Sequence, residues 1–445
     1  MKKNNSGRRK FIEKMAIAGA LASPAIGSFL SSCTRKSAYR SPVFPDQAPD
    51  GNVLKAGLVG CGGRGTGAAR NFLNAGPNLE ITALGDVFPH RLEQCRSNLK
   101  GRFDVEIPDA NCFTGFDSYK RVIDSGVDVV LLCEPPYFRA ASFEYAVQAR
   151  KHVFIEKPVG TDPVSVRSVM ATGRMAESAG LVVVAGTHYR HMRDRVKALE
   201  MVRNGIIGDI ISVNCYFNMS KLWHVNRQPG WCDMESMVRD WVNWCWLSGD
   251  HIVEQHIHEL DTVAWFMGRH PVRALGFGSR HRRLTGDQYD NFSVDYVYDD
   301  GRHMHSMCRQ IDGCANKVDT YFYGTGGYTN GMNRVWDYNG NVLWEYQYPL
   351  DEEGQSTGRL AVSPHDQEII NFVTAIRTGN YVNDTENVTG ANIVAIMGRE
   401  SAYTGREVSY EEIVASNTKL GPDELKFGPV NIPAVPPIPG TAPSV

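Results

Sequence analysis

A glycine-rich turn near residue 60 is the stretch of this chain with the clearest chemical meaning. An apolar run, residues 54–59, leads into Gly60-Cys61-Gly62-Gly63-Arg64-Gly65, which has the spacing G-x-G-x-x-G. In such a turn the first glycine permits a tight bend, the second lets the backbone approach a pyrophosphate, and the third lets the following helix pack against its strand. The helix N-terminus then faces the anion. The spacing predicts a nucleotide-binding turn, but glycine-rich turns are common and the pattern needs support from its surroundings.

An acidic residue at the expected distance supports this interpretation. A second apolar run, residues 79–84, is followed by Asp86, which lies 21 residues after Gly65. In dinucleotide-binding units an acid at this position accepts hydrogen bonds from the adenosine ribose and disfavours a 2′-phosphate. We therefore expect NAD as the cofactor, with NADP less favoured. The alternative is an ordinary strand–helix turn with a surface acid.

Two more charged positions stand at the ends of apolar runs. Residues 127–133 lead into Glu134-Pro135, and residues 152–155 lead into Glu156-Lys157. Parallel, doubly wound sheets bind ligands at the carboxyl ends of their strands. We expect the cofactor to contact the glycine turn and these strand ends, namely Gly60, Gly62, Gly63, Arg64, Gly65, Asp86, Glu134, Pro135, Glu156 and Lys157.

A histidine and a carboxylate at helical spacing could exchange protons with a substrate. Glu254 and His258 are four residues apart within a helix expected over residues 251–267, so they should share one face. A carboxylate raises the pKa of a neighbouring imidazole and fixes its tautomer, which suits a general base. His256 adds a second imidazole for substrate binding. The alternatives are an ion pair on a helix surface and a metal site; no H-E-x-x-H motif is present, and we expect no metal.

Substrate contacts are also expected from two other segments. His188, Tyr189 and Arg190 follow an apolar run, residues 181–185, at the boundary between the two halves of the chain. Residues 223–246 contain five tryptophans, whose faces could stack on sugar rings while neighbouring polar groups bind hydroxyls. Trp241 and Asn243 are the expected contacts there. The alternatives are a surface loop for the first segment and core packing for the second.

The elements that would position these residues change character halfway along the chain. Up to residue 185, apolar runs alternate with segments of helical spacing at residues 140–150 and 164–178, which predicts a doubly wound parallel sheet of the Rossmann type. Beyond it, strands are expected at residues 210–219, 273–277, 292–298, 302–308 and 318–323, and helices at 193–204, 365–378 and 388–403. The predicted fold is an N-terminal α/β domain followed by an α+β domain with a large, mostly antiparallel open sheet.

The ends of the chain carry signals of a different kind. Arg8-Arg9 precedes an apolar stretch, residues 15–30, and Leu30-Ser31-Ser32-Cys33 follows; this resembles a twin-arginine export signal ending in a bacterial lipobox. We expect lipidation of Cys33 and a periplasmic or cell-surface location, with an uncleaved N-terminal helix as the alternative. The expected parts are a signal (1–33), a tether (34–50), an NAD(P)-binding domain (51–187), a substrate and oligomerisation domain (188–420) and a proline-rich tail (421–445).

Charge and cysteine content bear on other classes of protein. Residues 1–32 carry six Lys or Arg and one Glu, so the formal net charge of −2 becomes −7 without them, and bulk charge gives no sign of nucleic-acid binding. The only membrane contact we expect is through the N-terminal lipid. The ten cysteines include no C-x-x-C pair, which favours buried free thiols and leaves a Cys308–Cys314 disulfide open.

From residue 55 to about residue 413 the chain resembles the Gfo/Idh/MocA oxidoreductase family. The resemblance rests on the glycine turn, on residues 127–130, on Lys-His-Val-Phe-Ile-Glu-Lys-Pro at 151–158, on residues 205–208, and on Glu254-x-x-x-His258-x-x-Asp261. It implies that Lys157 contacts the reacting hydroxyl and the nicotinamide ribose, and that Glu254 and His258 supply acid–base groups. Glu254 stands where most members have Asp, and His256 where many have Gly, so a reshaped pocket is expected. The resemblance also implies a homo-oligomer assembled through the C-terminal sheet.

The expected periplasmic or cell-surface location would constrain how the cofactor is regenerated, because no pool of free NAD is expected outside the cytoplasm. A tightly bound NAD(H) would have to be regenerated in place while a hydroxyl of a sugar, polyol or glycoside exchanges a hydride with it. One alternative is an NAD-dependent glycoside hydrolase that oxidises its substrate transiently with no net redox change. The Tyr-x-x-His-Gly stretch of the family's α-N-acetylgalactosaminidases is not evident, which disfavours that activity. The other alternative is a non-catalytic glycan-binding lipoprotein.

Overall fold

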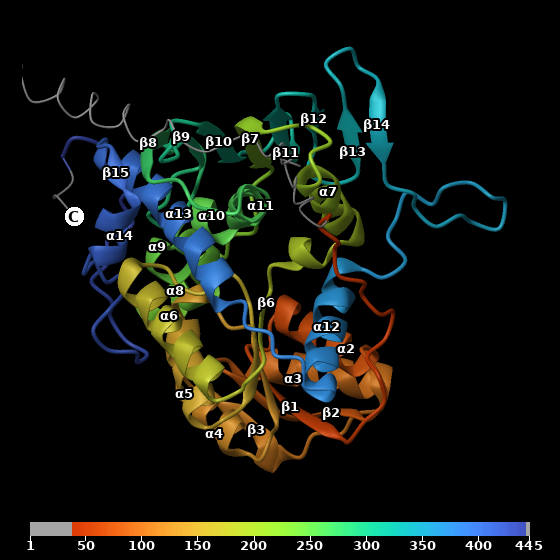
Figure 1. Ribbon diagram of the computed structural model, residues 1–445. Helices are drawn as coiled ribbons and strands as arrows, with labels where there is room; N and C mark the ends of the chain where they lie inside the picture. Colours follow the sequence, from red (N-terminus) through yellow and green to blue (C-terminus); the bar gives the residue numbers. More distant parts are fainter. Residues whose placement is uncertain (1–37, 442–445) are drawn as a thin grey trace, which may run out of the picture. The chain divides into compact units, whose positions relative to one another are not determined.

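Six short apolar strands form the first sheet of the computed structural model, which describes residues 38–441 (Figure 1). All of them pair in parallel, in the order β3-β2-β1-β4-β5-β6. The strand order reverses between β1 and β4, which is where dinucleotides bind in such sheets. The strands are β1 Leu54–Val59, β2 Leu79–Asp86, β3 Cys112–Thr114, β4 Val129–Leu132, β5 His152–Ile155 and β6 Val183–Ala185.

Helices cover both faces of this sheet, so its central strands are buried on both sides. β4 reads Val-Val-Leu-Leu and is buried along its whole length, the continuous apolar pattern that parallel sheets require. A helix from much later in the chain, α12 (Pro364–Thr378), packs beside α2 and completes one of the two cores (Figure 1). The other elements between these strands are α2 Gly63–Asn74, α3 Pro89–Phe103, η1 Asp109–Asn111, α4 Ser118–Asp124, α5 Pro136–Gln148 and α6 Pro163–Ser178.

The second sheet is larger and mostly antiparallel. Its nine strands lie in the order β14-β13-β12-β11-β7-β10-β9-β8-β15, and among these named strands β7 and β10 pair in parallel. Alternate residues of β9 and β10 are buried, so one face packs on helices and the other is more open. The strands are β7 Ile210–Met219, β8 Arg273–Ser279, β9 Asn291–Val297, β10 His303–Gln310, β11 Lys317–Gly324, β12 Tyr328–Thr329, β13 Arg334–Trp336, β14 Val342–Glu345 and β15 Val408–Ser409.

Two helices, α11 and α13, provide most of the cover on the buried face of this sheet. α13 also packs against α6, so the two sheets belong to one compact unit from Tyr39 onward. The elements of this half are η2 His188–His191, α7 Arg193–Arg203, α8 Asp233–Arg239, η3 Trp241–Asn243, α9 Cys245–Ser248, α10 His251–Glu254, α11 Ile257–Met267, α13 Thr385–Thr404 and α14 Tyr410–Ala415.

The predicted fold class is confirmed, but the helix expected over residues 251–267 is wrong in one respect. It is broken into α10 and α11 by Gln255 and His256. The N–H of His256 donates to the carbonyl of His251, five residues back, so the turn is wider than that of a regular α-helix. Spacing alone cannot reveal such a widened turn. Glu254 and His258 therefore lie on different helices.

The two ends of the described chain lie against the body. Residues 39–50 were expected within the tether, yet Ala48 is buried in a core and Gln367 donates to the carbonyl of Pro45, so the tether prediction is wrong for this part. At the other end residues 416–441 run without helix or strand. The expected export signal and Cys33 lie outside the described residues. Within residues 38–441, no helix is long and apolar enough to span a bilayer.

Candidate active site

The glycine turn has the geometry that its spacing predicts. Gly60 has a φ of +89°, and a Cβ there would lie 2.5 Å from the backbone nitrogen of Glu134. A Cβ on Gly65 would overlap the carbonyl oxygen of Gly60. By contrast, Cβ atoms on Gly62 or Gly63 would meet nothing within 4 Å. The first and third glycines thus permit close packing, and the second faces open space where a phosphate could approach.

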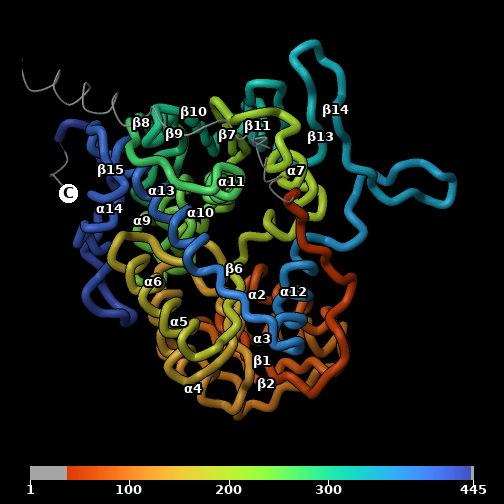
Figure 2. Tube along the Cα trace, viewed as in Figure 1, coloured from red at the N-terminus to blue at the C-terminus, as the bar shows by residue number. Residues whose placement is uncertain are grey.

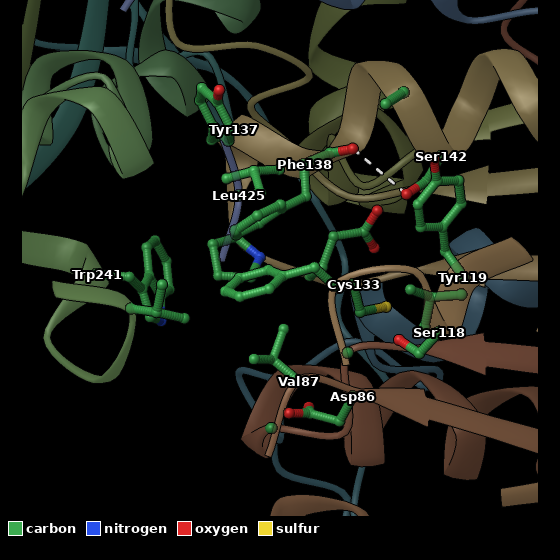
Figure 3. A pocket seen from close by; sticks show the side chains of 18 of the residues that line it. Asp86, Val87, Ser118, Tyr119, Cys133, Tyr137, Phe138, Ser142, Trp241 and Leu425 are labelled. Atoms are coloured by element: carbon green, nitrogen blue, oxygen red, sulfur yellow. Dashed lines mark hydrogen bonds between the residues drawn. The ribbon is translucent and has the colours of Figure 1, made fainter. Parts of the chain in front are cut away.

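A cavity of about 1030 Å³ opens in front of this turn. Figure 3 shows Asp86 and Val87 on one side of it and Tyr137, Phe138 and Leu425 on another. Its size is at the upper end of the range for small-molecule and cofactor sites. Its walls also include Gly60, Gly62, Gly63, Arg64, Gly65, Glu134, Pro135, Trp223, Trp231 and Trp241.

Asp86 ends β2 and is held by the glycine turn. Its Oδ2 accepts from the backbone N–H of Cys61 at 2.7 Å, and its Oδ1 accepts from the N–H of Phe88 at 2.8 Å. Burial raises the pKa of Asp86, an effect that these two N–H groups partly offset. Each carboxylate oxygen can accept a further hydrogen bond, and Asp86 lines the cavity, as contact with a ribose diol requires.

Glu134 is the most unusual group on the cavity wall. Its carboxyl is buried and neither oxygen has a hydrogen-bond partner. Burial raises its pKa to about 7. A buried polar group without a partner is uncommon in native proteins and calls for an explanation, here a ligand that donates to it. The open glycine turn, the strand-end acid and this carboxyl together fit a dinucleotide.

Arg64 and Glu156 lie next to the cavity, but they are paired with each other. Arg64 forms ion pairs with Glu156 and, at 2.7 Å, with Glu368 of α12. Burial opposes ionisation of Glu156, but the charges of Arg64, Arg139 and Lys157 outweigh it and keep its pKa low. The two expected cofactor contacts therefore fix the base of the site, and Arg64 still presents one side to the cavity.

Lys157, directly after β5, is tied to the C-terminal domain. Its Nζ donates to the carbonyl oxygen of Glu254 at 2.6 Å and to the Glu254 carboxylate at 3.1 Å. Both side chains are about nine-tenths buried. The predicted Glu254–His258 pair is thus wrong: Glu254 orients the lysine instead of the imidazole. An ammonium group has three donors, so one N–H of Lys157 stays available to a substrate oxygen.

His258 begins the first turn of α11 in a cluster of aromatic rings. Its ring centroid lies 4.6 Å from that of His188 and 5.0 Å from that of Tyr189. Burial, followed by the nearby charge of Lys157, lowers the pKa of His258 well below its usual value. The imidazole is therefore neutral near pH 7, and its Nδ1, which is buried without a hydrogen-bond partner, is left for a substrate hydroxyl. The sequence predicted a base at this position, but with a raised pKa, and that part is wrong.

His365 is a site residue that the sequence analysis missed. It lies at the start of α12, and its ring centroid is 4.3 Å from that of His188. Its Nδ1 lies 3.2 Å from Glu368, the partner of Arg64. Nothing in the local sequence relates residue 365 to residue 188, because only the return of α12 to the first domain brings them together.

Three predicted substrate contacts have structural partners instead. His256 is buried, with its Nε2 2.5 Å from the hydroxyl of Ser306, so its ring faces the interior of the second domain. Arg190 makes a bidentate ion pair with Asp261 at 2.8 and 2.9 Å. We therefore correct His256 and Arg190 to structural roles.

Asn243 is likewise buried and donates to Asp240 at 2.8 Å. It borders a separate cavity of about 320 Å³ rather than the large one. Trp223, Trp231 and Trp241 line the large cavity, whereas Trp246 is fully buried against Tyr137. The tryptophan cluster thus divides between a cavity wall and a core.

The large cavity and the proton-transfer groups are neighbours rather than one space. The cavity walls do not include Lys157 or His258. Arg64 joins the two places, because it borders the cavity and pairs with the residue before Lys157. Within the described part of the chain, no group of three His, Cys, Asp or Glu side chains could hold a metal, and Cys308 and Cys314 are free thiols.

The chain matches two relatives of known name over most of its length. It is 25% identical to glycosyl hydrolase family 109 protein 4 of Phocaeicola vulgatus, over 78% of this chain and 66% of that protein. It is 23% identical to D-glucoside 3-dehydrogenase of Escherichia coli, over 83% of this chain and 89% of that protein. For the curated relatives that it matches most strongly, the chain spans about half to two thirds of their length.

One similar solved structure is that of scyllo-inositol dehydrogenase from Lactobacillus casei with bound NAD(H) and scyllo-inositol. The two structures superpose with a TM-score of 0.58 and 20% sequence identity, and the match covers 81% of this chain and 99% of the dehydrogenase chain. At that identity the likeness shows the fold alone.

Two family models, which together match more than half of the chain, agree with this fold. The oxidoreductase family with an NAD-binding Rossmann fold matches residues 54–187, and the GFO/IDH/MocA C-terminal domain matches residues 196–329. The first contains the glycine turn, Asp86, Glu134 and Lys157, and the second contains Glu254 and His258. The chain belongs to the Gfo/Idh/MocA family of NAD-binding oxidoreductases.

Proposed function

We propose that this protein is an NAD(H)-dependent oxidoreductase that acts on a hydroxyl group of a sugar, polyol or glycoside. One arrangement carries the proposal. Lys157, just after the end of β5, donates to Glu254, and its charge acts on the buried His258; both groups lie next to a cavity large enough for a dinucleotide. The relative named above as a D-glucoside 3-dehydrogenase, which the chain matches over 83% of its own length, supports the same class of substrate.

The side chains divide the chemistry between them. When bound, the nicotinamide would take a hydride from the substrate carbon or return one to it. Lys157 donates its remaining N–H to the substrate oxygen and stabilises negative charge on it. His258 accepts the hydroxyl proton on oxidation and gives it back on reduction, a contribution of about 100-fold or more for a positioned base. Asp86 and the glycine turn hold the adenosine ribose and the pyrophosphate, with NAD favoured over NADP.

A second candidate is a glycoside-cleaving reaction with no net redox change. The family 109 glycosyl hydrolase among the relatives favours it. Transient oxidation of a hydroxyl acidifies the neighbouring C–H, so that the glycosidic substituent can leave before water adds and the hydride returns. The same Lys157 and His258 would serve, and the two candidates differ only in their net products.

We also propose that the protein is exported in folded form and anchored through a lipid on Cys33. The support is the sequence Arg8-Arg9 and the lipobox-like Leu30-Ser31-Ser32-Cys33. Export would leave the enzyme without free NAD, so tight retention of the nucleotide becomes a functional need. A homo-oligomer formed through the second sheet is consistent with the exposed Leu275 and Phe277 on β8.

The fate of the nucleotide in the purified protein tests the function. We expect NAD(H) to be released on denaturation, and a panel of glycosides and polyols to change the absorbance of the bound nicotinamide. A lasting change with a ketone product supports the oxidoreductase, whereas a free sugar without lasting change supports the hydrolase. His258→Asn should abolish either signal, with the exposed His281→Asn as the matched control. Protein that neither contains nor binds the nucleotide would refute both candidates.

A further inference from the structure

The chain beyond α14 crosses from one domain to the other over the outside of the large cavity. It leaves α14 beside α6, where the guanidinium of Arg167 donates to the carbonyl oxygens of Val414 and Ser416. The N–H of Leu420 then donates to Asp162 Oδ2, at the N-terminus of α6, at 2.8 Å. The segment therefore starts its crossing on the dinucleotide-binding domain.

The same segment is fastened again on the second domain. The N–H of Val430 donates to Asp233 Oδ2 at 3.1 Å, and the carbonyl of Gly428 accepts from the N–H of Met234 at 3.1 Å. Both partners lie at the start of α8. Residues 419–430, which we call the clasp, thus bridge α6 and α8 with hydrogen bonds at both ends.

Between these two anchors the clasp carries Leu425, which lines the cavity, and Phe427, which is about half exposed and packs against the cavity-lining Phe88 and Phe116. Leu425 lines the cavity wall close to Tyr137 and Phe138 (Figure 3). The ring of Phe427 lies 6.2 Å from that of Phe88 and 5.2 Å from that of Phe116. Phe88 and Phe116 follow the ends of β2 and β3, so the clasp covers the side of the cavity where the strand-end acid Asp86 would hold the adenosine.

The path of the clasp is fixed by close approach. Gly421 has a φ of +94°, and a Cβ there would lie 2.5 Å from Tyr137 Cε2. Arg239 of α8 lies over the Phe88 ring at 4.1 Å and over the Trp231 ring at 4.5 Å, so a guanidinium and a second aromatic wall enclose the same place. The clasp itself lies outside both matched family models, which cover residues 54–187 and 196–329.

We propose that the clasp is part of the nucleotide site, with Leu425 and Phe427 holding the adenosine end of the dinucleotide and slowing its release. The inference rests on the proposed function, because it assumes a bound dinucleotide. A nucleotide that leaves through this side must first displace the clasp and expose its apolar contacts to water. Full burial of one Leu or Phe side chain corresponds to a factor of about ten or more in an equilibrium. Leu425 and Phe427 are each only partly covered, so the two side chains together should account for about tenfold. The clasp therefore supplies the retention that an exported enzyme needs.

The dissociation rate of the nucleotide tests this directly. The full-length protein is loaded with NADH and mixed with excess NAD, and the loss of nicotinamide fluorescence is followed with time. We expect Leu425→Ala/Phe427→Ala to raise the dissociation rate about tenfold or more. The matched control is Val435→Ala/Ile438→Ala, which removes two exposed apolar side chains further along the same tail. It should leave the rate unchanged.

Ligand fragments locate the effect and separate the two proposals. The affinity for ADP-ribose should fall in the clasp variant as much as that for NAD, whereas the affinity for nicotinamide mononucleotide should stay the same. The thermal midpoint of the nucleotide-free variant should stay close to that of the wild type, which excludes general unfolding. Unchanged dissociation and ADP-ribose binding in a variant that still binds NAD would overturn the clasp alone. A wild-type protein that binds no nucleotide would overturn the clasp and the proposed function together.

Discussion

Replacement of Glu134 by Gln should stabilise the nucleotide-free protein and weaken its hold on the nucleotide. The carboxyl is buried on the cavity wall without any hydrogen-bond partner. Glutamine has nearly the same shape but carries no charge, so the change removes the cost of burying a carboxylate. The same change also removes the acceptor strength that a ligand hydroxyl or amide N–H would use. Stability and binding should therefore move in opposite directions.

The magnitude follows from the pKa of this group. Burial raises the pKa of Glu134 from 4.5 to about 7. Because its pKa is higher in the folded than in the unfolded chain, the folded state binds the proton more tightly, and stability falls as the pH rises from 4.5 through 7. The pKa difference of about 2.5 units corresponds to a loss of about 3 kcal/mol, complete above about pH 7. Glu134→Gln avoids this loss.

Urea unfolding of the nucleotide-free protein measures the effect. The variant should match the wild type at about pH 4 and exceed it by about 3 kcal/mol at about pH 8. Glu144→Gln, an exposed carboxyl on α5, is the matched control and should show no such pH dependence. A stability difference that is the same at both pH values would refute the reasoning. NAD binding to the wild type near pH 7 should also release protons, and this release should vanish in Glu134→Gln.

Three further outcomes are expected. Lys157→Met and His258→Asn should each lower turnover about 100-fold or more while NADH binding measured by nicotinamide fluorescence stays nearly unchanged; wild-type turnover in both variants would contradict the assignment. Asp86→Ala should reduce the preference for NAD over NADP in paired binding titrations. An unchanged ratio of the two dissociation constants would mean that another group binds the adenosine ribose. Cys33→Ser should move the protein from the membrane to the soluble fraction of the cell with its catalytic parameters intact; a wild type that is already soluble would contradict lipid anchoring.

The sequence predicted those parts of the fold and site that depend on neighbouring residues. Short apolar runs bounded by turn residues gave β5 and β7 their correct ends, and the glycine spacing predicted the turn at residue 60. The errors come from contacts between distant residues. Glu254 lies four positions from His258, but its partner is Lys157, 97 residues away. The widened turn at His256, which separates the two, depends on backbone hydrogen bonds that residue types do not encode.

The cavity walls show the same limit. A run of apolar residues predicts that a strand is buried, but it does not tell whether a tryptophan packs in a core or lines a ligand cavity. The five tryptophans between residues 223 and 246 are divided between these two places. The neutral state of His258 follows from burial and from Lys157, neither of which is local in sequence. The proline-rich composition marked the tail as a separate part of the chain, but its place on the cavity follows from anchors on α6 and α8.

The return of α12 to the first domain sets the order in which the protein can be made. In Figure 2 α12 lies beside α2. Ile369, Phe372 and Val373 of α12 complete the core there, and Glu368 forms an ion pair with Arg64 in the glycine turn. The ribosome must therefore release residues 364–378 before the N-terminal domain can close its core. Until then the growing chain holds an unfinished sheet with an apolar face exposed, which is a target for chaperones. The nucleotide should load only after most of the chain has been synthesised.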